Sequence, residues 1–159
     1  NAREALSYRR EAQALEQEHG GRLLASDWFA ALEAELALQA GDAERAVDLA
    51  QRLTPRFRQE QLPLALGCAE QAWGLALGRL APSRPEQADE HLAAGLAVLE
   101  SAQQVLLAAQ LQLKWAQLCR RRGSVEQAAA LHARAVAQFE AGGCAHVIEG
   151  IEKACLTWL

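Results

Sequence analysis

Small side chains recur at the same place in four successive helical segments of this chain. Four alanines occupy this place, with separations of 41, 42 and 40 residues: Ala5, Ala46, Ala88 and Ala128. Seven residues after each comes another small or apolar residue: Ala12, Leu53, Gly95 and Ala135. Seven residues are two helical turns, so each pair lies on one helix face, where small side chains let a neighbouring helix approach closely. A period of about 40 residues with two helices in each period predicts a helical solenoid.

Helix start and stop signals along the chain predict about eight helices. The expected helices span residues 2–19, 23–40, 43–53, 62–80, 85–100, 102–122, 125–141 and 145–158. Asp42 predicts an N-cap, and the segments Ser83–Glu86 and Ser124–Gln127 predict capping boxes. The segment 55–62, which begins with a proline, is left open as either a loop or an extra helical turn. Because the loops are short, neighbouring helices are expected to be antiparallel.

The composition supports an all-α fold. Hydrophobic residues make up 51% of the chain, most of them Ala and Leu, and only 5% of the residues are aromatic. Ala, Leu, Gln, Glu and Arg are strong helix formers. No apolar run approaches the ~20 residues needed to span a bilayer, and the net charge of −4 gives no general affinity for nucleic acid or anionic membrane. Residues 1–159 are predicted to form a single domain, which the start at Asn1 and the lack of Met suggest is cut from a longer protein.

Large and small residues stand side by side at two places 42 residues apart, Trp73-Gly74 and Trp115-Ala116. A small residue in the next helix, Ala88 or Ala128, is placed to pack against each pair. This arrangement resembles the tetratricopeptide repeat, and the resemblance implies a right-handed superhelix of antiparallel helix pairs. The long period is similar to that of the C-terminal regions of bacterial multidomain regulators, among them large ATP-binding LuxR-type transcription activators and some adenylate cyclases and kinases.

The resemblance also implies an inner, concave surface formed by the first helix of each pair. The residues expected to contact a partner or ligand there are Trp28, Glu35, Gln39, Gln71, Gln110, Gln117 and Arg121. For Trp28, packing against the first helix is the alternative. Trp73 and Trp115 are expected to be buried, and Trp158 either seals the array or is exposed. Tetratricopeptide domains that clamp acidic chaperone tails carry Lys and Asn on this surface; neither occurs at the matching positions, so a carboxylate clamp is not expected.

No motif predicts a catalytic residue, a cofactor or a metal. The four cysteines form no C-x-x-C pair, and Cys119 falls on the expected core face of its helix, so packing in a reducing cytoplasm explains them. Cys144-x-His146 lacks further ligands at standard zinc spacing, and His132 is expected in the core. The run Arg120–Arg122 complements a helix C-terminus.

These features predict a non-enzymatic protein-interaction or effector-sensing module of a bacterial signalling or transcription regulator. The expected partners are a protein, other domains of the same parent chain, or a small-molecule effector, bound in the concave groove without direct contact to nucleic acid or membrane. The alternative is a structural spacer or oligomerisation element without a ligand of its own, and homo-oligomerisation is left open.

Overall fold

The fold was obtained as a computed structural model, which describes residues 2–20 and 26–158, with side chains up to Leu156. These residues form helices and no strand, as the composition predicts. The elements are α1 Ala2–His19, α2 Ser26–Gln39, α3 Ala43–Gln59, α4 Pro63–Leu80, α5 Pro85–Ser101, α6 Val105–Arg121, α7 Val125–Ala141, a 3₁₀ helix Ala145–Val147, and α8 Ile148–Trp158. The predicted start of the second helix at Leu23 and the side chain of Trp158 lie outside what the structure describes.

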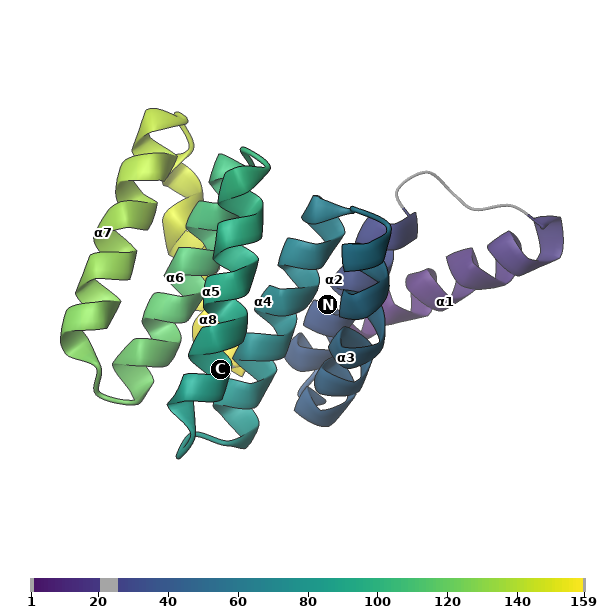
Figure 1. Cartoon of the computed structure of the whole chain (residues 1–159), viewed down its shortest axis with the longest axis horizontal. Coiled ribbons are helices and arrows are strands. Elements are labelled where there is room, and N and C mark those ends of the chain that lie inside the picture. The colour runs from purple at the N-terminus through teal and green to yellow at the C-terminus, as the bar shows by residue number, and fades with distance from the viewer. Residues whose placement is uncertain (1, 21–25, 159) are drawn as a thin grey trace.

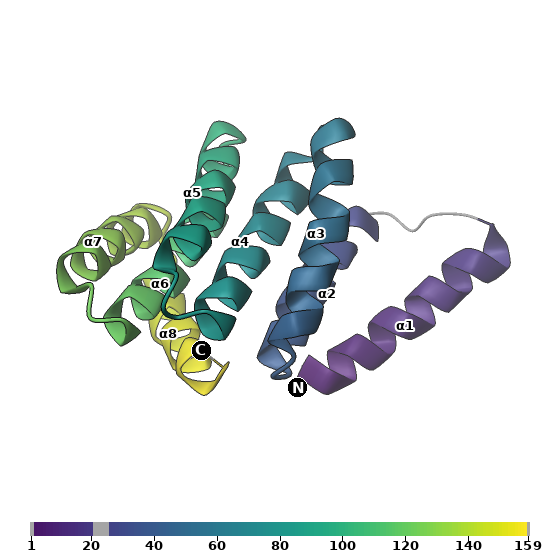
Figure 2. The same cartoon turned by 60° about the horizontal axis from the view of Figure 1, so that its bottom comes forward.

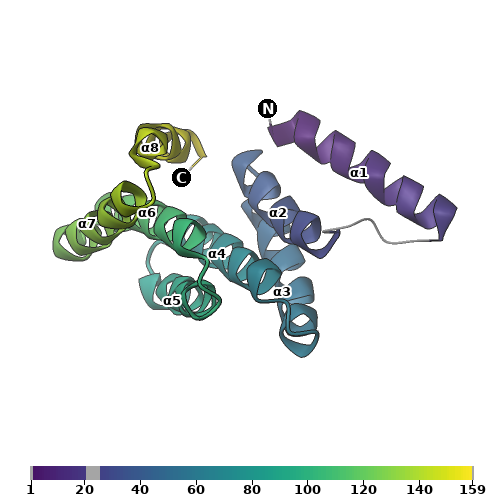
Figure 3. The same cartoon turned by 90° about the horizontal axis from the view of Figure 1, so that it is seen from above.

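Successive helices pack in pairs, α2 with α3, α4 with α5, and α6 with α7 (Figure 1). Contacts of α4 with α2 and α3, and of α6 with α4 and α5, join the pairs into one array. Seen from above, α3 and α5 lie on one side of the row formed by α2, α4 and α6, whereas α1 and α8 lie on the other side (Figure 3). The paired arrangement that the 40-residue pattern predicts is therefore present in the described part of the chain.

The backbones of α4 and α5 approach closely at glycine. A Cβ atom at Gly74 would lie 2.7 Å from the carbonyl oxygen of Ala88, and a Cβ atom at Gly95 would lie 3.0 Å from that of Gly67. Gly67 and Gly74 are seven residues apart on α4, as Ala88 and Gly95 are on α5. The predicted small-residue face of α5 is thus the face on which the two helices cross.

The equivalent alanines of the other pairs are buried as well. Ala46 on α3 and Ala128 on α7 belong to the same Ala- and Leu-rich core as Ala88. The first member of the pattern differs, because Ala5 is only half-buried and no described side chain of α1 is fully buried. Figure 2 shows α1 near α2 at its N-terminal end and diverging from α2 along its length.

Helix α3 is longer than the sequence pattern predicts. The helix continues past the expected end at Leu53 and through Pro55 to Gln59, so of the two alternatives left open for segment 55–62 the extra helical turn is the one present, over residues 55–59. A proline inside a helix removes one backbone hydrogen bond and crowds the preceding turn. Here the additional turn buries Thr54 and Phe57, and Phe57 is completely enclosed in a cluster with α2 and α4 residues. Burial of an aromatic ring outweighs the cost of the proline.

Helix capping follows the sequence in part. Oδ1 of Asp42 accepts a hydrogen bond from the amide of Arg45 at 3.0 Å, which confirms the predicted N-cap of α3. The capping box at Ser83 is wrong, because α5 begins with Arg84 as its N-cap residue and no side chain caps it. Ser124 is the N-cap residue of α7 as expected, but its hydroxyl makes no capping hydrogen bond.

Helix α8 leaves the order of the preceding pairs. Within the expected helix 145–158, the chain forms the 3₁₀ helix and then α8. Helix α8 packs on α6 and also reaches α2, two pairs back along the chain. It therefore lies on the side of the row of α2, α4 and α6 that faces away from α3 and α5 (Figure 3). The candidate site is the open space that this position of α8 leaves between α8, α2 and α6.

Candidate functional site

An open groove of about 390 Å³ lies between α2, α6 and α8, and we call it the inner groove. One wall is polar and comes from α2 and α6. The other wall is largely apolar and comes from the 3₁₀ helix and α8. The lining residues are Glu35, Gln39, Gln110, Lys114, Val147, Gly150, Ile151, Ala154 and Cys155.

Glu35 lies at the centre of the polar wall. Its Oε1 atom accepts hydrogen bonds from Nζ of Lys114 at 2.6 Å and from Nε2 of Gln39 at 3.0 Å. Its Oε2 atom accepts a hydrogen bond from Nε2 of Gln71 at 3.0 Å. Because these residues come from α2, α4 and α6, the carboxylate joins the first helices of three successive pairs.

The ion pair beneath the groove is largely shielded from water. Only 4% of the Lys114 side chain and 13% of the Glu35 side chain are exposed. An ammonium group has three N–H donors. Among the described residues, Glu35 is the one that accepts a hydrogen bond from Lys114. The groove is therefore bordered by a fixed, desolvated cation with hydrogen-bonding capacity left over.

Sequence reasoning missed Lys114. The residue just before it, Leu113, is buried against α7 with Ala135 and Phe139. The residues of α6 that line the groove are Gln110 and Lys114. The detectable signal was the single lysine of α6, which follows Gln110 by four residues, about one helical turn.

The apolar wall of the groove has space beside α8. Val147 and Ile151 pack partly against core residues, while Cys155 is almost fully buried. A Cβ atom added at Gly150 would meet no atom within 4 Å. A bound molecule can therefore place an apolar group against α8 and polar groups against α2 and α6.

Five of the seven residues expected on the inner surface lie in or beside this groove. Glu35, Gln39 and Gln110 line it, and Gln71 holds Glu35 from α4. Gln117 lies beside it, where its amide donates to Oε1 of Glu152 on α8 at 3.3 Å. Gln117 thus holds α8 in place.

The other two expected residues, Trp28 and Arg121, lie elsewhere. Trp28 is half-buried and packs against the cluster that contains Phe57 and Cys68, so its packing partners are on α3 and α4. The extra turn of α3, which supplies Phe57, accounts for this difference. Arg121 lies at a separate pocket next to the α4–α5 loop.

Aromatic and histidine side chains only partly follow the expected burial. Trp115 is buried, and its indole N–H donates to Oδ1 of Asp89 at 2.7 Å. Trp73 is half-buried and stacks on His91, with ring centroids 3.8 Å apart. The prediction that His132 lies in the core is wrong: it is part-exposed, with Nε2 at 3.1 Å from Oε1 of Glu152, a residue that α8 brings to it.

Three of the four cysteines pack in the core. Cys119 is completely buried, as its place on α6 predicts, and Cys68 and Cys155 are nearly so. Burial raises the pKa of the Cys68 thiol and that of the Cys155 thiol to about 11, with the Glu35 carboxylate contributing in the same direction. These two thiols therefore stay protonated near neutral pH. Because the thiolate is the reactive form of cysteine, we expect both to be unreactive. Cys144 is the more exposed thiol.

Wider searches add little to this geometry. Comparisons with models of protein families, with curated proteins and with solved structures found no match to the chain. Across residues 2–20 and 26–158, no three His, Cys, Asp or Glu side chains are grouped as metal ligands. None of the helices described is both long and apolar enough to cross a membrane.

Proposed function

We propose that this chain is a non-enzymatic protein-interaction module whose inner groove binds a short segment of a partner protein or of another domain of the same parent chain. The proposal includes the finer architecture, a right-handed tetratricopeptide-like superhelix with a period of about 40 residues. In such arrays the first helices of the repeats form the binding surface. The proposed setting is a bacterial signalling or transcription regulator.

One observation carries the proposal: the Glu35–Lys114 pair is buried at the border of an open groove. Buried ions need their hydrogen-bonding capacity satisfied, because desolvation without compensation is costly. Backbone carbonyl groups of a bound segment can accept from the remaining N–H groups of Lys114. The amide side chains of Gln39 and Gln110 offer donors and acceptors to a peptide backbone as well.

The shape and lining of the groove fit an amphipathic segment. One apolar side chain of the segment can pack against Val147 and Ile151 in the open space beside Gly150. Both charges of the opposite wall are largely neutralised by each other. The groove therefore favours an apolar side chain next to a hydrogen-bonding backbone, without demanding a strongly charged segment.

Effector sensing is a second candidate, and the size of the groove favours it. Pockets for small ligands have volumes of about 300–1,000 Å³, and the inner groove lies at the lower end of this range. A small polar molecule with one apolar part would use the same two walls. The two candidates share a site and differ in what occupies it.

Filling the groove tests both candidates. Gly150→Trp places a large side chain in open space on α8, and Ala133→Trp, at an exposed position of α7, is the matched control. Random short peptides displayed on phage would be selected on the wild-type chain, and a panel of small polar metabolites would be screened by thermal shift. We expect the selected ligands to lose about tenfold or more in affinity for Gly150→Trp and to bind Ala133→Trp normally.

The same experiment separates binding from a purely structural role. Peptide enrichment identifies an interaction module, whereas enrichment of metabolites alone identifies a sensor. If no ligand is enriched, or if Gly150→Trp binds every ligand as well as wild type does, the groove proposal is wrong. Sedimentation of the wild-type chain would then show whether it is an oligomerisation element.

A further inference from the structure

A groove separate from the inner groove lies between α1 and α2, and we call it the α1–α2 groove. Its volume is about 410 Å³. Helix α1 stays close to α2 only at its N-terminal end and diverges from it along its length (Figure 2). The α1–α2 groove shares no lining residue with the inner groove. It is therefore a distinct concavity at the N-terminal end of the array.

Both walls of the α1–α2 groove are apolar. On each helix the wall residues are three or four positions apart, so they lie on one helix face. The charged residues of the lining, Arg9 and Glu16, pair with each other, with Nη1 and Oε2 3.7 Å apart. The apolar wall residues are Ala5, Tyr8 and Ala12 from α1, and Phe29, Leu32 and Leu36 from α2.

The large apolar side chains at this groove are incompletely packed. Tyr8 is 62% exposed and Phe29 is 43% exposed. Leu15, two helical turns after Tyr8 on the same face of α1, is 51% exposed. No described side chain of α1 is fully buried, although helices in proteins gain most of their stability from packing of an apolar face. An exposed apolar surface of this kind marks an interaction site.

The two facing walls fit an α-helix. A helix binds in a groove through apolar side chains at positions i, i+3 or i+4, and i+7, and the wall residues of α1 and α2 have this same spacing. The small side chains of Ala5 and Ala12 let such a helix approach α1 closely. A helix between α1 and α2 would cover Tyr8 and Phe29, and it would give α1 the packing that it lacks.

A row of glutamates beside the apolar face of α1 indicates the charge of the bound helix. Glu4, Glu11 and Glu18 are exposed and follow one another at intervals of seven residues. Each is three or four positions from Tyr8 or Leu15, so the row borders the exposed apolar side chains. Basic residues that flank the apolar stripe of a bound helix complement this row, whereas acidic residues are repelled. A second copy of α1 carries the same glutamates and is the less suitable occupant.

We propose that the α1–α2 groove is a docking site for a basic amphipathic helix of a partner protein. The apolar stripe of that helix packs between α1 and α2, and its Lys or Arg side chains pair with Glu4, Glu11 and Glu18. This site is additional to the inner groove and does not depend on ligand binding there.

Two synthetic helical peptides test the proposal on the full chain. The first, the lysine peptide, has leucine at i, i+3 and i+7 in each pair of turns and lysine on both flanks of this stripe. The second, the glutamate peptide, has glutamate in place of every lysine. Binding is measured by fluorescence anisotropy at low ionic strength. We expect the lysine peptide to bind, and the glutamate peptide to bind about tenfold more weakly or worse, as the loss of three surface ion pairs predicts.

Glutamate variants test whether the row on α1 selects the charge. A triple variant with Glu4→Gln, Glu11→Gln and Glu18→Gln should bind the lysine peptide about tenfold more weakly. The matched control makes the same change of net charge at three exposed glutamates of α5 and α7 and should bind normally. Circular dichroism checks that both variants keep the helix content of the wild-type chain. The control residues, each replaced by Gln, are Glu90, Glu126 and Glu140.

An apolar variant tests the groove itself. Tyr8→Ser removes a side chain that is mostly exposed, so the fold should persist, and the lysine peptide should bind about tenfold more weakly because it loses a buried apolar contact. Val125→Ser, at a position of α7 that is 72% exposed, is the matched control and should bind normally.

Four results would overturn the proposal. The first is no binding of the lysine peptide by the wild-type chain, and the second is equal binding of the two peptides. The third is an equal loss in a variant and its matched control, which would indicate diffuse attraction. The fourth is a wild-type dimer in sedimentation that Tyr8→Ser converts to a monomer, because a second copy would then occupy the groove. Gly150→Trp should leave lysine peptide binding unchanged, so failure of the inner groove proposal and failure of this one are separately visible.

Discussion

Replacing Gly74 with alanine tests the crossing of α4 and α5, on which the alignment of the helix pairs depends. In an exposed helix interior, glycine to alanine stabilises by up to about 1 kcal/mol. At Gly74 the new Cβ atom would lie 2.6 Å from Cγ of Leu92 and 2.7 Å from the carbonyl oxygen of Ala88. The leucine can shift, but the oxygen belongs to the backbone of α5, so the helices must separate. Overpacking costs about 1–3 kcal/mol, and we expect a net loss of about 1–2 kcal/mol.

Two other glycines provide controls for this measurement. A Cβ atom at Gly150 meets nothing within 4 Å, so Gly150→Ala should be neutral or stabilising. A Cβ atom at Gly78 meets only side-chain atoms of Leu118, the nearest at 2.5 Å, so Gly78→Ala should fall between the other two. Free energies of unfolding would come from urea denaturation followed by circular dichroism. If Gly74→Ala is as stable as Gly150→Ala, α4 and α5 do not cross at Gly74 and Ala88.

Two further predictions concern buried alanine and cysteine. Ala128→Leu, at a position that is 1% exposed in the core, should destabilise the chain by about 1–3 kcal/mol and Ala133→Leu, at an exposed position, by much less; equal urea midpoints would show that the register of α7 is wrong. Near neutral pH, iodoacetamide followed by mass spectrometry should label Cys144 well before Cys68 and Cys155, because burial keeps the latter two protonated up to a pKa of about 11. Equal labelling rates in the folded chain would contradict that burial.

The helix pairs could be predicted because their signals are local or periodic. The small residues at Ala88 and Gly95 identify a contact face whatever the partner helix is, and the structure places Gly74 and Gly67 opposite them. The end of α3 could not be predicted in this way. Pro55 is a strong local stop signal for a helix. The helix continues past it because Phe57 packs against residues of α2 and α4, which are distant in the sequence.

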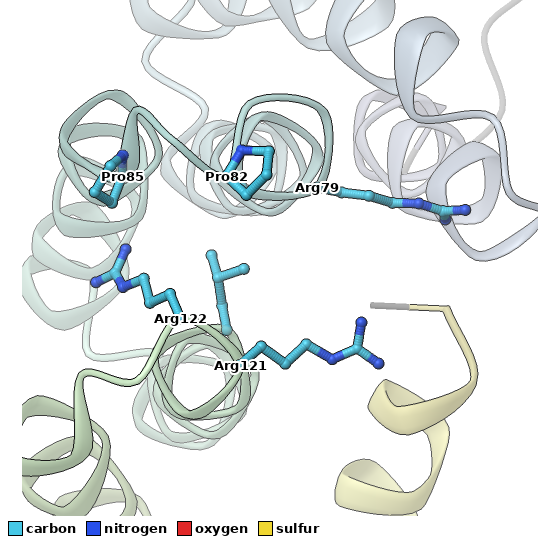
Figure 4. Close-up of a pocket in the computed structure, with 7 residues that line it drawn as sticks. Arg79, Pro82, Pro85, Arg121 and Arg122 are labelled. Atoms are coloured by element: carbon cyan, nitrogen blue, oxygen red, sulfur yellow. The ribbon is translucent and has the colours of Figure 1, made fainter.

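The candidate site was harder to predict than the fold because α8 packs on α6 and α2 and does not continue the row of helix pairs. Spacing placed Glu35, Gln39 and Gln110 on the inner surface, where they line the groove. It could not show that α8 would form the opposite wall, since no local signal tells a helix which earlier helix it will pack on. The pocket beside Arg121 (Figure 4) likewise depends on the α4–α5 loop, whose sequence shares no periodicity with that of α6.

The Glu35–Lys114 pair is not explained by stability alone. A buried ion pair gains little net free energy, because desolvation of both ions offsets much of their attraction, and apolar replacements of similar volume are often neutral or stabilising. The surrounding core consists mainly of alanine and leucine. The pair does join α2 to α6 across the row of first helices, and it presents a lysine with unused donors to an open groove. The proposed recognition of a hydrogen-bonding ligand would account for both the position of the pair and its incomplete satisfaction, whereas packing alone accounts for neither.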